Sequence, residues 1–193
     1  MKYLTLLAVL IIASSCTSGN KNNLEVKAPE ISKQKSPEGY DPEKRLEELG
    51  LQLQEISAPL ANYVHAVRAG NLVFLAGKGP KNEVGETIIG KLGDEYNVDQ
   101  GYAAAKSVGI QQLSVLKSEL GNLNKIKRIV QVTGMVNAVP EFKDHSKVIN
   151  GYSDLMVDVF GDRGKHARAA VGMGSLPNNM AVEIEMVVEI FED

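Results

Sequence analysis

The sequence predicts an α+β domain in which two long helices cover one face of a sheet. Three observations predict it: hydrophobic residues recur at helical spacing over residues 99–120 and again over 145–160, and β-branched runs precede, separate and follow these segments. The expected order of elements is β-β-α-β-α-β-β. With 193 residues, the chain has the length of one such domain and a tail.

A short helix is expected ahead of this domain. Asp41 is a typical N-cap residue, Pro42 suits the first turn, and Gly50 stands where a left-handed helix stop belongs. We expect residues 41–57 to form an accessory helix and its connection, packed on the edge of a main domain that spans 58–193.

The first two strands are expected at residues 63–67 and 72–76, as a hairpin whose turn spans 68–71. Residues 78–98 are rich in Gly, Glu, Asn and Lys, which is typical of a long loop. The strongly β-branched run at 126–136 predicts an interior strand.

Each long helix has a predicted buried stripe and a glycine at its end. The helix over 99–120 is followed by Gly121, and the helix over 145–160 by Gly161. Residues at helical spacing form the two inward stripes: Tyr102, Ala105, Gly109, Leu113, Leu116 and Leu120 in the first helix, and Val148, Tyr152, Leu155 and Val159 in the second.

The closing segment, residues 166–185, predicts a hairpin of two paired strands joined by a turn at 176–179. Alternation along the first strand puts Arg168 on one face with small residues only, which leaves an open hollow beside the guanidinium. Glu183 lies fifteen positions later on the second strand, opposite its apolar face, so we expect the hairpin to hold this carboxylate near the guanidinium. Because guanidinium binds carboxylate in a bidentate way, we expect a small carboxylic acid as the ligand. Alternatively, Arg168 and Glu183 are ordinary solvated strand residues.

Composition excludes some classes of function. The net charge is −3, from 21 basic and 24 acidic residues, and no long basic cluster is present, which argues against a nucleic-acid-binding surface. Three scattered histidines and one cysteine do not predict a metal site.

The N-terminus has the layout of a secretory signal peptide over residues 1–15: a positive start, a short apolar run and small residues before Cys16. A cysteine at this position resembles the lipidation box of bacterial lipoproteins, although Ala13 replaces the usual leucine. We expect a lipidated Cys16, a flexible tether over 16–40, and an exported envelope lipoprotein that meets the membrane only through its lipid. A plain signal peptide with an incidental cysteine is the alternative.

Several segments together resemble the RidA/YjgF family, trimeric proteins that hydrolyse reactive imines and enamines. The similarity extends from about residue 58 to residue 192. The segments that carry it are Asn62-Tyr63-Val64, 70–77, 148–152, Arg168-Ala169-Ala170-Val171, Leu176-Pro177 and Val182-Glu183-Ile184-Glu185.

The resemblance implies a chorismate-mutase-like sandwich, a homotrimer with an inner β-barrel, and cofactor-free hydrolysis in pockets between subunits. Arg168 would clamp the carboxylate of a small 2-imino or enamine acid, and Glu183 would orient the water or take part in proton transfer. Tyr63 would line the pocket, Asn150 would sit at the adjoining subunit's rim, and Gly77 with Lys78 would form pocket wall.

One position departs from the family pattern, because Ala170 replaces the usual pocket cysteine. This leaves a non-catalytic module that binds small carboxylates as a second hypothesis. Tyr63 can also be a packing residue of the hairpin, and Asn150 an ordinary polar residue on a helix face. Ribonuclease activity fits the acidic composition poorly. Among the histidines, only His166 is close enough in sequence to Arg168 to merit a test.

Overall fold

The computed structural model describes residues 36–56, 59 and 61–192. The predicted leader, Cys16 and nearly all of the tether lie outside these residues. The described elements are α1 (Pro42–Glu48), β1 (Ala66–Ala69), β2 (Leu72–Lys78), α2 (Val98–Leu120), β3 (Ile126–Asn137), α3 (His145–Phe160), β4 (Ala167–Met173) and β5 (Val182–Ile190), with short 3-10 turns η1 (Leu123–Lys125), η2 (Gly161–Gly164) and η3 (Pro177–Asn179). After α1, the predicted β-β-α-β-α-β-β order is confirmed. None of the described helices has the length and apolar character needed to span a bilayer.

The five strands form one mixed sheet in the order β1-β2-β5-β3-β4. The predicted pairing of β4 with β5 is wrong, because β3 lies between them and bonds to both. The physical reason is the crossover through α3, which brings β4 back parallel to β3 on one side. The antiparallel β5 therefore occupies the other side of β3, where it also pairs with β2.

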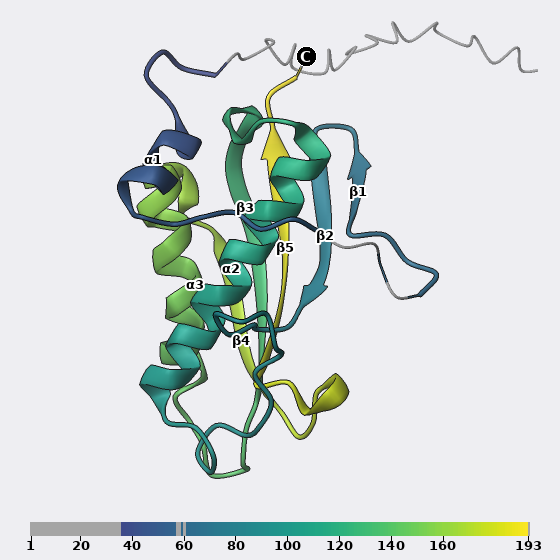
Figure 1. Cartoon of the computed structure of the whole chain (residues 1–193), viewed down its shortest axis with the longest axis vertical. Coiled ribbons are helices and arrows are strands. Elements are labelled where there is room, and N and C mark those ends of the chain that lie inside the picture. Colours follow the sequence, from purple (N-terminus) through teal and green to yellow (C-terminus); the bar gives the residue numbers. More distant parts are fainter. Residues whose placement is uncertain (1–35, 57–58, 60, 193) are drawn as a thin grey trace, which may run out of the picture. The chain divides into compact units, whose positions relative to one another are not determined.

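Both long helices lie on the same side of the sheet, as predicted (Figure 1). The helix α3 has the expected bounds, α2 begins one residue early, and Gly121 and Gly161 have positive φ at the two stops. Gly151 allows the two helices to approach closely, since a Cβ there would lie 2.0 Å from the carbonyl oxygen of Tyr102. The apolar residues of β5 are buried against the helices: Val182, Ile184, Met186, Val188 and Ile190.

The N-terminal hairpin is shifted from its predicted position. The strand β1 begins at Ala66 and pairs Ala69 with Leu72, so that Gly70, with φ of +63°, and Asn71 form a two-residue turn. Tyr63 therefore lies before the strand rather than in it. The predicted loop over 78–98 is largely irregular, but it is anchored by the fully buried Leu92, whose N–H donates to the Asn137 carbonyl at 2.8 Å.

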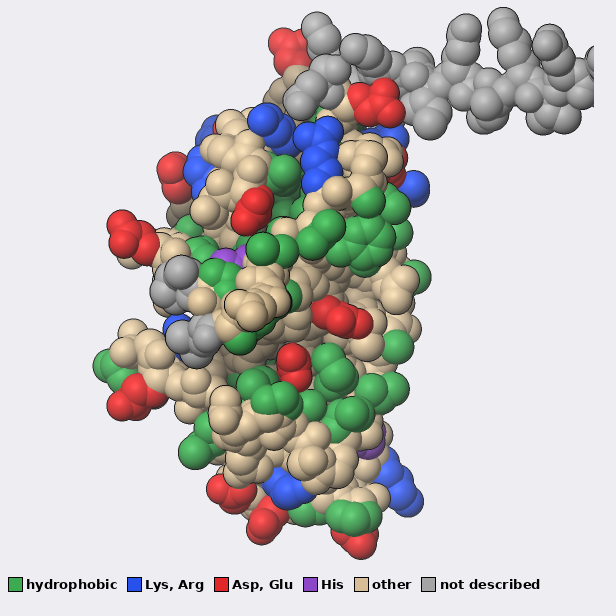
Figure 2. Space-filling view, turned by 90° about the vertical axis from the view of Figure 1, so that its right-hand side faces the viewer, with side chains coloured by type: hydrophobic (Ala, Val, Ile, Leu, Met, Phe, Trp, Pro, Cys, Tyr) green, Lys and Arg blue, Asp and Glu red, His purple; other side chains and the backbone are tan. Residues whose placement is uncertain are grey.

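The face of the sheet away from the helices carries exposed hydrophobic side chains. Val67, Phe74 and Val171 are 55%, 46% and 42% exposed. A shallow hollow of about 300 Å³ lies there, lined by Phe74, Leu75, Gln131, Thr133, Glu185, Met186 and Val187. Figure 2 shows hydrophobic side chains interspersed with a few acidic ones on this side of the molecule. Among the described residues, no helix covers this face.

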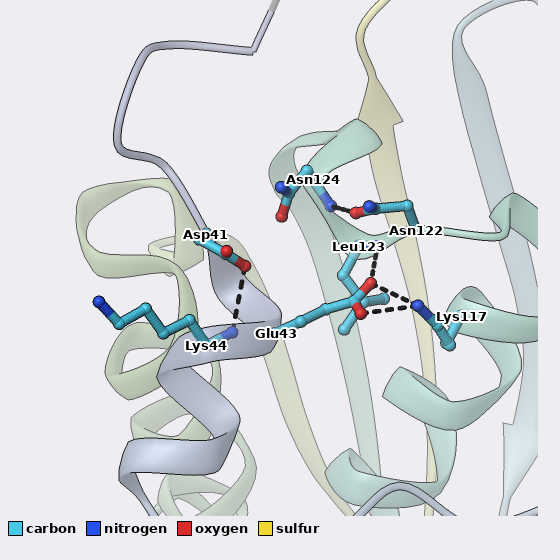
Figure 3. A network of polar contacts seen from close by, with 7 residues as sticks. All are labelled: Asp41, Glu43, Lys44, Lys117, Asn122, Leu123 and Asn124. Carbon is cyan, nitrogen blue, oxygen red and sulfur yellow. Dashed lines mark hydrogen bonds and ion pairs between the residues drawn. The ribbon is translucent and has the colours of Figure 1, made fainter.

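The helix α1 is held on the domain by a polar network (Figure 3) and by two buried side chains, Pro42 and Leu46. Asp41 caps the helix as predicted, accepting from the Lys44 N–H at 3.1 Å. The Glu43 carboxylate accepts from Lys117 Nζ at 2.6 and 2.8 Å and from the Leu123 N–H at 2.9 Å. Leu46 is 3% exposed and belongs to the main core.

We predict that Glu43→Ala lowers the free energy of unfolding by about 1–2 kcal/mol, because it removes an ion pair and leaves the Leu123 N–H without its acceptor. Urea denaturation at fixed protein concentration measures this change. The matched control is Glu47→Ala, since Glu47 is exposed on the same helix. Equal stabilities of the two variants would contradict the role given to Glu43.

Candidate functional site

Arg168 lies on the edge strand β4 and is anchored to α3. Its Nη1 donates to Asn150 Oδ1 at 2.9 Å and to Ser153 Oγ at 3.0 Å, while the side chain stays exposed. Among the described residues, no carboxylate forms an ion pair with this guanidinium, and its Nε and Nη2 have no protein acceptor. An anchored cation with unused donors can receive a carboxylate in a bidentate way.

Small residues bring α3 close enough to β4 for these contacts. Gly134 pairs with Ala170 across β3 and β4, and a Cβ on Gly134 would lie 2.6 Å from Ile149 of α3. Ala170 itself is half-buried and packs against the core. The helix α3 therefore lies close to β3 and β4 here, which places Asn150 and Ser153 within hydrogen-bonding distance of Arg168.

The open hollow predicted beside the guanidinium is mostly filled. Ala170 packs on the core, and the His145 ring covers Gly172, where a Cβ would lie 2.3 Å from His145 Nε2. Only Gly174, the last small residue of this face, has open space around it. The prediction failed because alternation identifies the face of a residue but not the helix that covers that face.

His166 and Ser153 complete the surroundings of Arg168. Ser153 Oγ lies 3.0 Å from His166 Nε2, and His166 Nδ1 lies 2.6 Å from the Gly164 carbonyl oxygen. We call Arg168, Asn150, Ser153 and His166 the arginine cluster. Sequence reasoning missed Ser153, because a serine in the middle of a helix carries no pattern that would distinguish it from a solvated residue.

Two other predicted site residues, Glu183 on β5 and Gly77 on β2, lie against each other. The half-buried Glu183 carboxylate lies over Gly77, where a Cβ would be only 2.4 Å from Glu183 Oε1. The register between β2 and β5 shifts at this point, which is a position where glycine is common in strands. Burial, and secondarily the neighbouring Glu185 charge, raises the pKa of Glu183 above its usual range.

Lys78 and Tyr63 both lie beside His65. Lys78 Nζ is 2.6 Å from His65 Nδ1, and the ring of the half-exposed Tyr63 meets the His65 ring edge-on at 6.4 Å. Partial burial, and then the Lys81 charge, lowers the pKa of Lys78. Lys78 and Tyr63 are thus grouped around His65. We call Glu183 and Gly77 the glutamate cluster.

The two clusters lie on opposite faces of the sheet. Arg168 pairs with Val132, whose other neighbour Met186 is buried under the helices. Glu183 pairs with Met135, three residues further along β3 and thus on the opposite face. The expectation that one chain holds the guanidinium beside the Glu183 carboxylate is therefore wrong. Asn150, expected at an adjoining subunit's rim, lies beside Arg168 of its own chain.

Among the residues that the structure describes, no group of three or more His, Cys, Asp or Glu side chains could hold a metal ion.

Comparison with known proteins places the chain in a family. Residues 43–190 match the family described as YjgF/chorismate mutase-like. Protein TCP17 of Trypanosoma cruzi is 42% identical over 146 residues, which cover 75% of this chain and 91% of that protein. The crystal structure of Atu1372 from Agrobacterium tumefaciens is 41% identical, with a TM-score of 0.71 over 77% of this chain and 93% of that one.

A more distant relative has a named activity. The 2-iminobutanoate/2-iminopropanoate deaminase of Dermatophagoides farinae is 27% identical over 133 residues, covering 68% of this chain and 88% of that protein. The family match covers most of the chain, and two relatives exceed 40% identity over nearly their whole length. The chain therefore belongs to the RidA/YjgF family, with the chorismate-mutase-like fold.

Proposed function

We propose that this protein is a trimeric deaminase that hydrolyses small reactive 2-imino or enamine acids in pockets between its subunits. In each pocket, the arginine cluster of one chain would face the glutamate cluster of its neighbour. The observation that carries the proposal is the guanidinium of Arg168, which Asn150 and Ser153 anchor and which no described carboxylate neutralises.

The position of the two clusters and the sheet face that no described helix covers both support association of several chains, and the number three is taken from the resemblance to the family. A site that uses both Arg168 and Glu183 needs two chains, because one chain holds them on opposite faces. The exposed Phe74 and Val171 on the face without helices would be buried by association. One heterologous contact repeated around a threefold axis closes a ring. Sedimentation equilibrium would test the number of subunits.

The proposed reaction needs only water. Arg168 would bind the substrate carboxylate and so fix the adjacent C=N carbon. Water adds to that carbon, a proton passes to the nitrogen, and the C–N bond breaks, so that an imino acid and water give a 2-oxo acid and ammonia. Glu183 would move the proton, and its raised pKa brings the carboxyl closer to neutral pH, where such exchange is efficient. The named deaminase among the relatives supports this reaction class.

A second function is favoured by one residue. Ala170 stands where the family usually has a pocket cysteine, and it is half-buried against the core. A pocket without that thiol could hold a small carboxylate without turning it over. Calorimetry that finds binding of pyruvate, together with no ammonia release from imino acids, would select this binding function.

We also propose that the chain is exported and lipidated on Cys16, as the leader sequence predicts. The domain would then act at the cell envelope, tethered by its N-terminal segment. Incorporation of a labelled fatty acid in the producing bacterium, and its loss in Cys16→Ser, would test this placement.

We predict that Arg168→Ala lowers kcat/KM for an enzymatically generated imino acid by about a hundredfold or more, since the carboxylate loses its charged partner in the transition state. Arg168→Lys should recover little of the rate, because an ammonium cannot bind bidentately or reach both Asn150 and Ser153. Ammonia release measures both. The control is Arg45→Ala, an exposed arginine of α1. Wild-type rates in Arg168→Ala would refute the clamp.

We further predict a pH-dependent effect of Glu183 on stability. Because its pKa in the folded chain is raised from 4.5, the folded state holds this proton at pH values where the unfolded chain has lost it. The free energy of unfolding should therefore fall as pH rises from about 4.5 through the raised pKa. Glu183→Gln should remove this part of the decline.

Urea denaturation at several pH values and one protein concentration measures this dependence. Glu119→Gln, which changes an exposed glutamate of α2, serves as the control and should leave the decline in place. The same decline in wild type and Glu183→Gln would contradict the raised pKa.

A further inference from the structure

An unbroken chain of hydrogen bonds leads from the Arg168 guanidinium into the protein. Arg168 Nη1 lies 3.0 Å from Ser153 Oγ, Ser153 Oγ lies 3.0 Å from His166 Nε2, and His166 Nδ1 lies 2.6 Å from the Gly164 carbonyl oxygen. Three elements contribute to it: β4, α3 and η2. Gly164 is buried and Ser153 and His166 are half-buried, so the inner end of the chain is shielded from water.

The direction of every bond in this chain is fixed by chemistry. A carbonyl oxygen only accepts, so Nδ1 of His166 carries a hydrogen and donates to Gly164. In the neutral ring Nε2 then has a lone pair, and the Ser153 hydroxyl donates to it. Ser153 Oγ consequently presents its own lone pairs to Arg168, which only donates. Donors and acceptors alternate without conflict, and such bonds reinforce one another.

We propose that His166 is a positioning residue that acts through Ser153 to hold the Arg168 guanidinium, so that the grip on a bound carboxylate depends on the protonation of His166. The proposal takes Arg168 as the carboxylate clamp, as in the function proposed above. His166 itself does not touch the ligand. Its effect is to keep the Ser153 hydroxyl turned away from Arg168, which leaves the oxygen lone pairs free to accept.

Protonation of His166 reverses the hydrogen bond between Ser153 and His166. Nε2 would then carry a hydrogen, so His166 and Arg168 would both donate to the same oxygen, and two positive groups would converge on Ser153. Burial, and secondarily the Arg168 charge, lowers the pKa of His166 below its usual range, while the bond to Gly164 opposes this shift. The ring is therefore neutral at pH 7. As pH falls through the lowered pKa, the bond between Ser153 and His166 reverses, and Arg168 then faces a second positive charge across Ser153 Oγ.

Two effects of the imidazolium on a carboxylate ligand oppose each other. Its charge attracts the anion, but the ligand would bind the outer side of the guanidinium, farther from the ring and exposed to screening by salt. The imidazolium also repels the Arg168 guanidinium, because both groups contact the same atom, Ser153 Oγ. The direct effect on Arg168 is the stronger one, so affinity should fall at low pH.

The other charged groups near His166 are largely engaged elsewhere. In and beside η2, Asp162 pairs with Lys165 at 2.7 Å, and Arg163 donates to the Lys127 carbonyl. On α3, Asp154 accepts from the Tyr102 hydroxyl, and Asp158 is exposed to solvent. On β4, Arg168 is the charge that acts on the pKa of His166.

The coupling is tested without any ligand by NMR, which follows the side-chain Nε–H signal of Arg168 and the ring signals of His166. The pH is lowered from 8 to about 4, which extends below the ordinary histidine range because the pKa of His166 is lowered. The Arg168 signal should shift with the midpoint of His166 in wild type. It should lose that shift in Ser153→Ala and in His166→Gln. Ser146→Ala, an exposed serine of α3, is the matched control and should keep it. If the Arg168 signal does not shift when His166 titrates in wild type, the proposal is overturned.

The effect on the clamp is tested by calorimetry with pyruvate, which stays ionised over this range. Wild-type affinity should fall about threefold to tenfold as pH drops from 7.5 to below the His166 midpoint that NMR measures, and Ser153→Ala should lose a similar factor at every pH. His166→Gln should retain most of the wild-type affinity at neutral pH, because its amide oxygen can accept from Ser153. Its affinity should not change with pH. His166→Phe should bind pyruvate more weakly than wild type at neutral pH, because phenylalanine offers no acceptor to Ser153.

These outcomes separate the two proposals. If Arg168 follows His166 by NMR but pyruvate does not bind at any pH, the clamp is refuted and the coupling stands. If pyruvate binds but its affinity stays flat or rises as pH falls through the His166 midpoint in wild type, the positioning role of His166 is refuted while the clamp stands.

Discussion

One topological constraint determines where the site residues lie: β3 is placed between β4 on one side and β5 on the other. Side chains alternate between faces along each strand, and the register places Arg168 on the helix face and Glu183 on the bare face. No rotation of a side chain can bring these groups together in one chain. Any chemistry that uses both therefore requires a second copy of the chain.

The same packing that builds the core also prepares the guanidinium. Ile149 and Tyr152 of α3 are fully buried, and each is followed by a polar residue that contacts Arg168. The height of α3 over β3 and β4 is set by Gly134 and by the small Ala170. The anchor of Arg168 is thus rigid because its two partners stand on a helix that the core holds in place.

The sequence was sufficient for the local elements and insufficient for their pairing. Periodicity predicted both long helices, and Gly121 and Gly161 predicted their ends, because helix formation and its termination are local. The partner of β5 could not be predicted, since hydrogen-bonded strands can be distant in sequence and β3 was equally suited to β4 and β5. Buried polar contacts such as Gln112 Nε2 to the Ile184 carbonyl, at 2.6 Å, depend on that tertiary arrangement. Ser153 was missed for the same reason, because its contacts depend on the tertiary arrangement. Arg168 and Asn150 were selected because they lie in segments that resemble the family.

Complementation between two single variants shows whether Arg168 and Glu183 act together across a subunit contact. Arg168→Ala and Glu183→Gln chains, each inactive alone, are unfolded together, refolded and assayed for imino-acid hydrolysis. If each pocket takes Arg168 from one chain and Glu183 from the next, any mixed trimer regains one intact pocket, and an equal mixture should recover about one quarter of the wild-type activity. No recovery, in mixtures shown by mass spectrometry to contain mixed trimers, would mean that the two residues do not act together across a subunit contact.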